Sequence, residues 1–253
     1  MDTQPFTLEG EVALISGGAS GIGLAIAQSL IACGARVVIV GRRAAALAEA
    51  CGQLGASASS RQYDVTRHSE APELVADIAA NEGAVSLLVN NAGAHLKKPA
   101  EEVGEEEFAA LLDVHLLGAH ALSRAVFPAM RERGAGAIVF IASMASLMGL
   151  PRTLAYAAAK SGMLGVVRTL ASEWSPHGIR VNAIAPGWIE TAMMRRAVEN
   201  DPARKARILG RTPLGCFGSP EDIGWCAAFL CSPAARFITG ACLPVDGGAS
   251  IGF

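Results

Sequence analysis

One stretch near the start of the chain decides the fold: Val12-Ala13-Leu14-Ile15-Ser16-Gly17-Gly18-Ala19-Ser20-Gly21-Ile22-Gly23. A short apolar run ends in a glycine-rich loop, and the helical pattern Leu24–Cys33, closed by Gly34, follows directly. Glycines let a backbone approach a pyrophosphate closely, and the first turn of a helix offers unpaired N–H groups to an anion. An ordinary strand-to-helix turn is the alternative. The placement favours a dinucleotide site, whose predicted contacts are Ser16, Gly17, Ser20, Gly21, Ile22 and Gly23.

The same alternation continues along the chain. Short apolar runs bounded by Gly, Asn, Pro or Asp are typical of buried parallel strands, and helix-length patterns separate them. The predicted strands are Val12–Ser16, Arg36–Val40, Leu87–Asn90, Ala137–Ala142, Arg180–Ala185 and Ala241–Val245, and the longer predicted helices are Phe108–Met130 and Ala155–Trp174. This order predicts an α/β fold: a doubly wound parallel sheet of the Rossmann type in a three-layer αβα arrangement. We expect a single domain over residues 1–253.

Composition narrows the function classes. The chain has 253 residues, 51% of them hydrophobic and 17% charged, which excludes intrinsic disorder. A net charge of -2 and 5% aromatic residues give no reason to expect nucleic acid or a membrane surface as partner. The charge-free stretch Gly134–Pro151 contains glycines and serines, so we interpret it as a strand and a loop.

Targeting and metal signals are weak in this sequence. The N-terminus shows no secretory pattern, so we expect a cytoplasmic protein. Six cysteines without a CxxC pair predict free buried thiols and no metal site.

The end of the second predicted strand discriminates between cofactors. NAD enzymes usually place an acidic residue there to hold the ribose 2′-hydroxyl. This chain has Val40-Gly41-Arg42-Arg43 instead. The Arg42 guanidinium could pair with a 2′-phosphate, which favours NADP(H), with NAD(H) still possible. The alternative is that both arginines lie on the solvated first turn of a helix.

A second group of residues suggests the chemistry. Tyr156 and Lys160 are four residues apart in a helical pattern, and so lie on one face. A nearby ammonium stabilises a phenolate and so lowers the pKa of a tyrosine, which would make Tyr156 a general acid/base. Ser143 stands thirteen residues upstream, directly after a predicted strand. Its hydroxyl could donate to a substrate carbonyl.

With these motifs in order, the chain resembles the short-chain dehydrogenase/reductase family over nearly its whole length. The resemblance implies a nicotinamide-dependent oxidoreductase that transfers hydride between a secondary alcohol and a ketone. It implies catalysis by Ser143, Tyr156 and Lys160, with Tyr156 and Lys160 also touching the cofactor. Further cofactor contacts implied by the resemblance are Asp64, Val65, Asn91, Ala92, Gly93, Pro186, Gly187, Ile189 and Thr191.

Two positions depart from the family pattern. Ser16 stands where threonine is usual and keeps the hydroxyl. His115, in Asp113-Val114-His115-Leu116, stands where an asparagine is thought to anchor a water of a proton relay. His115 could serve that relay as a further catalytic residue, or it could only pack against neighbouring helices.

Substrate choice in this fold lies in the loop after Ser143 and in a lid at about 190–212. The segment Ala192–Gly210 contains two methionines, Met193 and Met194. It is basic, because it also contains Arg195, Arg196, Arg204, Lys205 and Arg207. A basic lid suits an anionic substrate, and a solvated helix face is the alternative. The chain is similar to gluconate 5-dehydrogenase-like members and to 3-oxoacyl-carrier-protein reductases. Gly134 and His177 stand where the latter carry exposed arginines. We therefore favour a small sugar acid or polyol.

Two expectations complete the sequence interpretation. Some proteins of this fold bind a dinucleotide as sensors or scaffolds without turnover, but they usually lack the tyrosine or the lysine. The two long predicted helices offer more apolar surface than one sheet face can cover, and tetramers are usual in the family resembled. We therefore expect a homotetramer.

Overall fold

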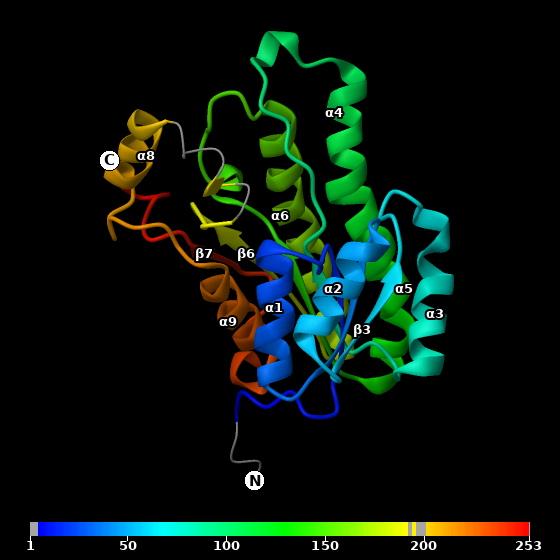
Figure 1. The fold of residues 1–253 in the computed structure, drawn as a ribbon. Coiled ribbons are helices and arrows are strands. Elements are labelled where there is room, and N and C mark those ends of the chain that lie inside the picture. Colours follow the sequence, from blue (N-terminus) through cyan, green and yellow to red (C-terminus); the bar gives the residue numbers. More distant parts are fainter. Residues whose placement is uncertain (1–4, 192–193, 196–200, 253) are drawn as a thin grey trace.

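The computed structural model describes residues 5–191, 194–195 and 201–252. Within these residues a parallel sheet of seven strands lies at the centre, in the order β3-β2-β1-β4-β5-β6-β7 (Figure 1). The strand order reverses at β1, because β4 pairs with its free side. The predicted doubly wound sheet is confirmed. The strands are β1 Val12–Ser16, β2 Arg36–Gly41, β3 Ala58–Gln62, β4 Leu87–Asn90, β5 Gly136–Ile141, β6 Ile179–Pro186 and β7 Cys242–Val245.

Helices cover both faces of the sheet, as a three-layer arrangement requires. One face packs against α3 (Ala71–Asn81), α5 (Gly118–Arg133) and α6 (Leu154–Trp174). The other face packs against α1 (Gly21–Ala32), α2 (Ala44–Leu54) and α9 (Pro220–Cys231). Two further helices, α4 (Glu105–Leu112) and α8 (Pro202–Arg211), lie beyond the carboxyl ends of the strands (Figure 1). That end of the sheet is where this fold binds ligands.

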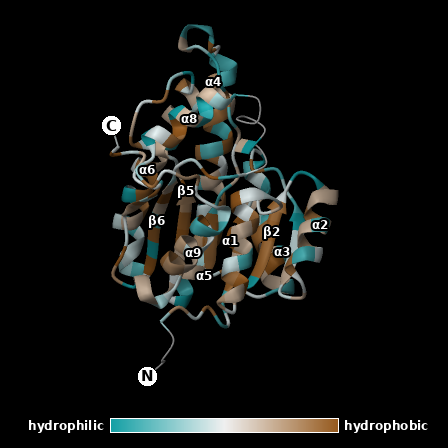
Figure 2. Cartoon of the chain, turned by 60° about the vertical axis from the view of Figure 1, so that its left-hand side comes forward, coloured by the Kyte–Doolittle hydropathy of each residue, from teal (hydrophilic) through white to brown (hydrophobic). Residues whose placement is uncertain are grey.

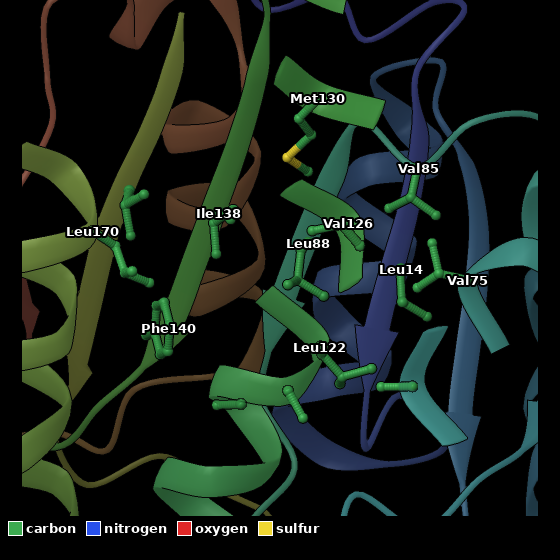
Figure 3. Packing of buried hydrophobic residues seen from close by; sticks show 14 of the residues in the cluster. Leu14, Val75, Val85, Leu88, Leu122, Val126, Met130, Ile138, Phe140 and Leu170 are labelled. Atoms are coloured by element: carbon green, nitrogen blue, oxygen red, sulfur yellow. The ribbon is translucent and has the colours of Figure 1, made fainter. Parts of the chain in front are cut away.

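The packing of the core explains why the sequences of most strands are continuous apolar runs. Leu14 of β1 joins the cluster under α5, whereas its neighbours Ala13 and Ile15 join the cluster under α1. The inner strands are thus buried on both faces, whereas β3 and β7 at the two edges are only partly buried. Figure 3 shows Leu122 and other side chains of α5 packed over the sheet, and in Figure 2 the strands are the most hydrophobic part of the fold.

The sequence missed one strand. β3 has the sequence Ala-Ser-Ser-Arg-Gln and is only partly buried, because it forms one edge of the sheet. An edge strand with polar side chains gives no apolar run to detect. The strands that were predicted end within one residue of their expected bounds, whereas α1 begins at Gly21, three residues before the predicted start.

The long helix predicted over Phe108–Met130 is not a continuous α-helix. The segment begins earlier, at Glu105, and a π-helical turn, Asp113–Leu117, separates α4 from α5. A π turn inserts one extra residue and redirects the side chains in it. Here it coincides with the burial of His115, which is only 1% exposed. The helical periodicity alone could not reveal this interruption.

One described helical stretch, Glu105–Arg133, has the length and apolar composition to cross a membrane. Its apolar face is accounted for, because Leu122, Val126 and Met130 are completely buried in the core. The charge-free stretch Gly134–Pro151 forms β5 and the loop after it, as expected.

The cysteines and possible metal ligands give a mixed result. All six cysteines are free thiols, but only Cys231 is fully buried and Cys216 is exposed, so the expectation of buried thiols is wrong for most of them. Among the described residues, no group of three or more His, Cys, Asp or Glu side chains could hold a metal ion.

Candidate active site

The glycine-rich loop packs tightly onto the start of α1. A Cβ atom at Gly23 would lie 2.3 Å from the carbonyl oxygen of Gly17, so only glycine allows this approach. The N-cap residue Ser20 makes no side-chain cap hydrogen bond, and the first turn of α1 contains no acidic residue. The N–H groups of this turn are therefore left to an external acceptor, and the helix dipole favours an anion there.

Two predicted residues join this loop to the loop after β4. The Ser16 hydroxyl accepts hydrogen bonds from the backbone N–H groups of Asn91 (3.1 Å) and Ala92 (3.0 Å). The Asn91 amide in turn donates to the carbonyls of Ser16 and Gly17, each at 3.0 Å. These four bonds fix the two loops side by side. Ser16 thus uses the hydroxyl that the family's threonine would supply.

The structure brings Ser143, Tyr156 and Lys160 together. Ser143 follows β5 directly, and its hydroxyl accepts from the N–H of Ala145 at 3.1 Å. It also forms a side-chain hydrogen bond with Tyr156. Tyr156 and Lys160 lie one turn apart on α6, with the lysine Nζ 5.7 Å from the centre of the phenol ring. The spacing predicted from the sequence therefore corresponds to one compact group.

Burial dominates the electrostatics of Lys160. The residue is 3% exposed, and its Nζ donates to the carbonyl of Ile141 at 2.5 Å. A second contact, at 3.8 Å, reaches the sulfur of Met163. Desolvation lowers the pKa of Lys160 to about 7. The side-chain amine of Lys160 is therefore only partly protonated at neutral pH.

Tyr156 differs from the expectation in one respect. Burial raises its pKa above the ordinary value, and the hydrogen bond from Ser143 opposes this rise. The predicted lowering of this pKa by Lys160 is therefore wrong. The physical reason is that the ammonium is directed at the Ile141 carbonyl and carries only part of its charge at neutral pH. In this state Tyr156 is a protonated phenol, which is a proton donor rather than a base.

His115 lies beside this group from the π-helical turn. Its ring meets the Tyr156 ring edge-on, with the centroids 5.5 Å apart. Its Nε2 lies 2.7 Å from the carbonyl oxygen and 3.2 Å from the N–H nitrogen of Ala94, and its Nδ1 has no hydrogen-bond partner among the described residues. Burial and the charge of Lys160 lower the pKa of His115 to about 3. A Cβ at Gly93 would lie 2.5 Å from this ring, so the imidazole is wedged against the loop after β4.

His95 is a site residue that the sequence interpretation missed. Its ring lies over Tyr156, with the centroids 4.7 Å apart and the planes tilted by 43°. Burial, then the charges of Lys97 and Arg204, lower the pKa of His95. Its position two residues after the Asn-Asn-Ala-Gly motif was the available signal, because the loop after β4 borders the site.

The residues predicted to face the adenosine half lie near the end of β2. Arg42 is exposed and follows the last residue of that strand, and no carboxylate takes its place. Asp64 is fixed by its own turn, because its Oδ1 accepts from the N–H (3.1 Å) and the hydroxyl (2.9 Å) of Thr66. These bonds lower the pKa of Asp64, with further help from the charge of Arg42. Val65 follows in the same loop and packs against the core.

The residues predicted to hold the nicotinamide follow β6. Pro186 ends the strand, and the Gly187 N–H donates to the carbonyl of Val245 at 3.0 Å. Ile189 is buried and bridges to Gly218. The Thr191 methyl lies 3.5 Å from where a Cβ at Gly21 would stand, which places it over the start of α1. The predicted lid lies partly outside the described residues, which exclude 192–193 and 196–200, and therefore Met193 and Arg196.

A comparison with protein families decides the relationship. A family model described as "Enoyl-(Acyl carrier protein) reductase" matches residues 17–250. The chain belongs to the short-chain dehydrogenase/reductase family. Members of this family are NAD(P)-dependent oxidoreductases, and this chain interconverts a secondary alcohol and a ketone by hydride transfer.

Individual relatives of this short-chain dehydrogenase/reductase match nearly its whole length. The galactitol 2-dehydrogenase (L-tagatose-forming) of Cereibacter sphaeroides is 39% identical over 97% of both chains. The 2-dehydro-3-deoxy-D-gluconate 5-dehydrogenase of Pseudoalteromonas atlantica is 37% identical, over 97% of this chain and 98% of the relative. A gluconate 5-dehydrogenase from Burkholderia cenocepacia, solved with NADP and tartrate, superposes with a TM-score of 0.93 at 33% identity over 98% of each chain.

The residues of this short-chain dehydrogenase/reductase fit the dinucleotide that the family uses. Close packing at Gly23 allows no side chain there, so the loop presents its backbone. The first turn of α1 offers uncapped N–H groups for a pyrophosphate. Asn91 and Ser16 hold the neighbouring loop in place. The Thr191 methyl lies against Gly21. These features come from three different segments, and together they form a cradle for an extended anionic ligand.

Proposed function

We propose that this enzyme acts on a small hydroxylated substrate, a sugar acid or a polyol, and prefers NADP(H). The observation that carries the proposal is the hydrogen-bonded pair Ser143–Tyr156, with Lys160 one turn away, beside the glycine-rich loop. The named relatives support the substrate class, since one is a galactitol dehydrogenase and another a 2-dehydro-3-deoxy-D-gluconate dehydrogenase.

The roles of the three residues follow from their contacts. When bound, the nicotinamide ring supplies or accepts the hydride. Ser143 donates a hydrogen bond to the substrate carbonyl, which stabilises the developing oxyanion. Tyr156 gives its proton to the same oxygen, and its raised pKa keeps the phenol protonated at neutral pH.

In alcohol oxidation the proton moves in the opposite direction. The substrate hydroxyl then loses its proton to the Tyr156 phenolate, whose charged form the hydrogen bond from Ser143 favours. Lys160, with a pKa of about 7, adds positive charge one turn away only at and below neutral pH.

The cofactor preference rests on Arg42. Its guanidinium stands at the end of β2, where an NAD-dependent enzyme would carry a carboxylate. A guanidinium pairs with a ribose 2′-phosphate through two parallel hydrogen bonds. The gluconate 5-dehydrogenase structure that contains NADP supports the same preference.

We assign His115 a positioning role rather than a place in a proton relay. A ring with a pKa of about 3 is neutral at working pH and is a weak base. Its Nε2 holds the backbone of Ala94 at 2.7 Å, and its edge supports the Tyr156 ring. The imidazole thus couples the loop after β4 to the proposed proton donor.

The two alternative functions have less support. A carrier-protein reductase needs exposed basic side chains for docking, yet Arg133 is tied to Glu11 by two hydrogen bonds of 2.6 and 2.7 Å. A sensor without turnover has no need of the Ser143–Tyr156–Lys160 group, all three members of which are present here.

We further propose one catalytic domain over residues 1–253, a lid at about 190–212, a homotetramer and a cytoplasmic location. Large apolar side chains left exposed on the single chain support association, because such surface favours burial between copies. They include Phe6, Leu214, Trp225, Phe237 and Ile251. Sedimentation at micromolar concentration tests the tetramer, and a species near 26 kDa would contradict it.

The decisive test of the proposed function is a turnover assay over a panel of ketones and polyols with each cofactor. We expect hydride transfer with small hydroxylated substrates and a higher kcat/KM with NADP(H). Cofactor binding without turnover of any substrate in the panel would support the sensor alternative instead.

A further inference from the structure

Basic side chains from three separate segments act on one another near the loop that carries His95. The loop after β4 contributes Lys97, the loop before α6 contributes Arg152, and α8 contributes Arg207. In Figure 1 all three segments lie beyond the carboxyl ends of the strands. Because the His95 ring is 4.7 Å from the Tyr156 ring, this cationic cluster borders the proposed proton donor.

The backbone holds Arg152 beside the loop after β4. The N–H of Lys98 donates to the carbonyl of Arg152 at 2.9 Å, and this bond links the two loops. Arg152 has a φ of 66°, and no other described non-glycine residue has a positive φ. Such a conformation is unfavourable for a side chain and persists where the surrounding structure imposes it, often at ligand sites. The chain therefore accepts strain at the residue that adds a charge to the cluster.

Among the described residues, positive charge dominates the surroundings of Lys97. Desolvation lowers the pKa of Lys97, as do the charges of Arg204, Arg152 and Arg207, while the charge of Asp201 raises it. The Lys98 Nζ pairs with Glu107 at 2.8 Å, so its charge is balanced locally. The whole chain has a net charge of -2, so the cationic field is local to this end of the fold. Crowded cations of this kind are stabilised when an anion binds among them.

The cofactor does not account for this charge. The proposed partner of a ribose phosphate is Arg42, which follows β2, whereas the cluster borders Tyr156 on α6. Between β2 and β5, the strand that leads to the site serine, stand β1 and β4. The anion that fits the cluster is therefore carried by the substrate.

We infer that Lys97 and Arg152 bind the carboxylate of the substrate and select sugar acids over the corresponding polyols. This inference rests on the proposed function, because it names the substrate class of the same site. The carboxylate lies on the substrate, away from the carbon that exchanges hydride, and it takes no part in the bond changes. Lys97 and Arg152 are therefore specificity-determining residues.

The experiment uses pairs of substrates that differ only in the charged group. The full-length enzyme is assayed with NADP⁺ and with gluconate against glucitol, galactonate against galactitol, and threonate against threitol. We expect a higher kcat/KM for at least one acid than for its alditol. The ratio of acid to alditol should fall on adding salt, because screening weakens the attraction.

Variants then assign the selectivity to the cluster. Lys97→Gln should lower the ratio of acid to alditol by about tenfold or more, the range of one lost charge-assisted hydrogen bond, mainly through KM. Arg152→Gly removes the charge while glycine tolerates the positive φ, so the loop keeps its shape. It should lower the same ratio. Arg236→Gln, which removes an exposed arginine outside both the cluster and the proposed lid, is the matched control and should keep the ratio of the parent.

Three outcomes overturn the inference. A parent enzyme that prefers the alditol in every pair contradicts it and leaves the proposed function standing. A ratio that Lys97→Gln and Arg152→Gly leave unchanged contradicts the assignment to these residues. A 3-oxoacyl thioester of coenzyme A turned over faster than every acid would show that the cluster serves a phosphate-bearing substrate. Absence of turnover with every substrate and both cofactors would refute the proposed function itself.

Discussion

Replacing the buried lysine should make the protein more stable at neutral pH and inactive. Lys160 is 3% exposed, and burial lowers its pKa to about 7. Methionine has a similar unbranched chain and no charge, so Lys160→Met fills the same space without an ammonium. The buried charge thus lowers the stability of the folded chain, and Lys160→Met removes this destabilisation.

The size of the effect follows from the pKa. A drop from the ordinary 10.5 to about 7 corresponds to at most about 5 kcal/mol, at about 1.4 kcal/mol per pKa unit. Between these two pH values the unfolded chain holds a proton that the folded chain has released, so the stability of the parent rises with pH across that window. Below pH 7 both states are protonated and the full cost applies. Between pH 7 and pH 9, the free energy of unfolding of the parent should therefore rise by about 2 kcal/mol relative to that of Lys160→Met.

Urea denaturation of both proteins at pH 7 and pH 9, at one fixed protein concentration, measures this gain. The variant also loses the hydrogen bond to the Ile141 carbonyl, and any change of that bond with protonation is already contained in the pKa of Lys160. Lys205→Met, at an exposed position of α8, is the control and should follow the parent. If the parent and Lys160→Met show the same pH dependence, Lys160 is not a desolvated ammonium and the electrostatic account of the site is wrong.

Three other perturbations test separate parts of the site. Arg42→Ala should erase the preference for NADP(H) in a binding titration of both cofactors. Each lost charge-assisted hydrogen bond is worth roughly 1.5–3 kcal/mol. Equal affinities of the parent for the two cofactors would contradict this assignment. Gly23→Ala should abolish cofactor binding in the same titration, because the added Cβ would lie 2.3 Å from the Gly17 oxygen, and unchanged binding would contradict the loop geometry. His115→Asn should keep most of kcat and the pH profile, because an amide can still hold the Ala94 backbone, whereas His115→Ala should lose activity. A limb missing from the pH profile of His115→Asn would make the imidazole a proton carrier after all.

Local patterns predicted most of the fold because its inner strands are buried on both faces. The run Val12–Ser16 is entirely buried, so every one of its residues signals the strand. β3 was missed because this edge strand is polar and only partly buried, whereas β7 at the other edge still has an apolar run. The π turn at Asp113–Leu117 was missed for a different reason. Its sequence continues the helical pattern, and its visible consequence is the burial of His115, which the sequence does not show.

The site was predictable where spacing within one element fixes geometry. Tyr156 and Lys160 are four residues apart on α6, and Ser143 directly follows β5, so sequence and structure agree on their proximity. The approach of His95 to Tyr156 depends on how two loops pack, which no local pattern contains. The raised pKa of Tyr156 depends on burial, and the sequence gives charges but not the extent of burial.

The central claim is that Tyr156 exchanges the substrate proton, and kcat of Tyr156→Phe measures it most directly. The phenol is the group hydrogen-bonded to Ser143, and the imidazole beside it, with a pKa of about 3, is poorly suited to replace it. General acid/base catalysis contributes roughly 10²–10⁴-fold, so kcat should fall by at least about a hundredfold while cofactor affinity, measured in parallel, stays within about twofold. A variant that keeps more than about a tenth of the parental kcat would contradict the account, since loss of a general acid/base does not allow it.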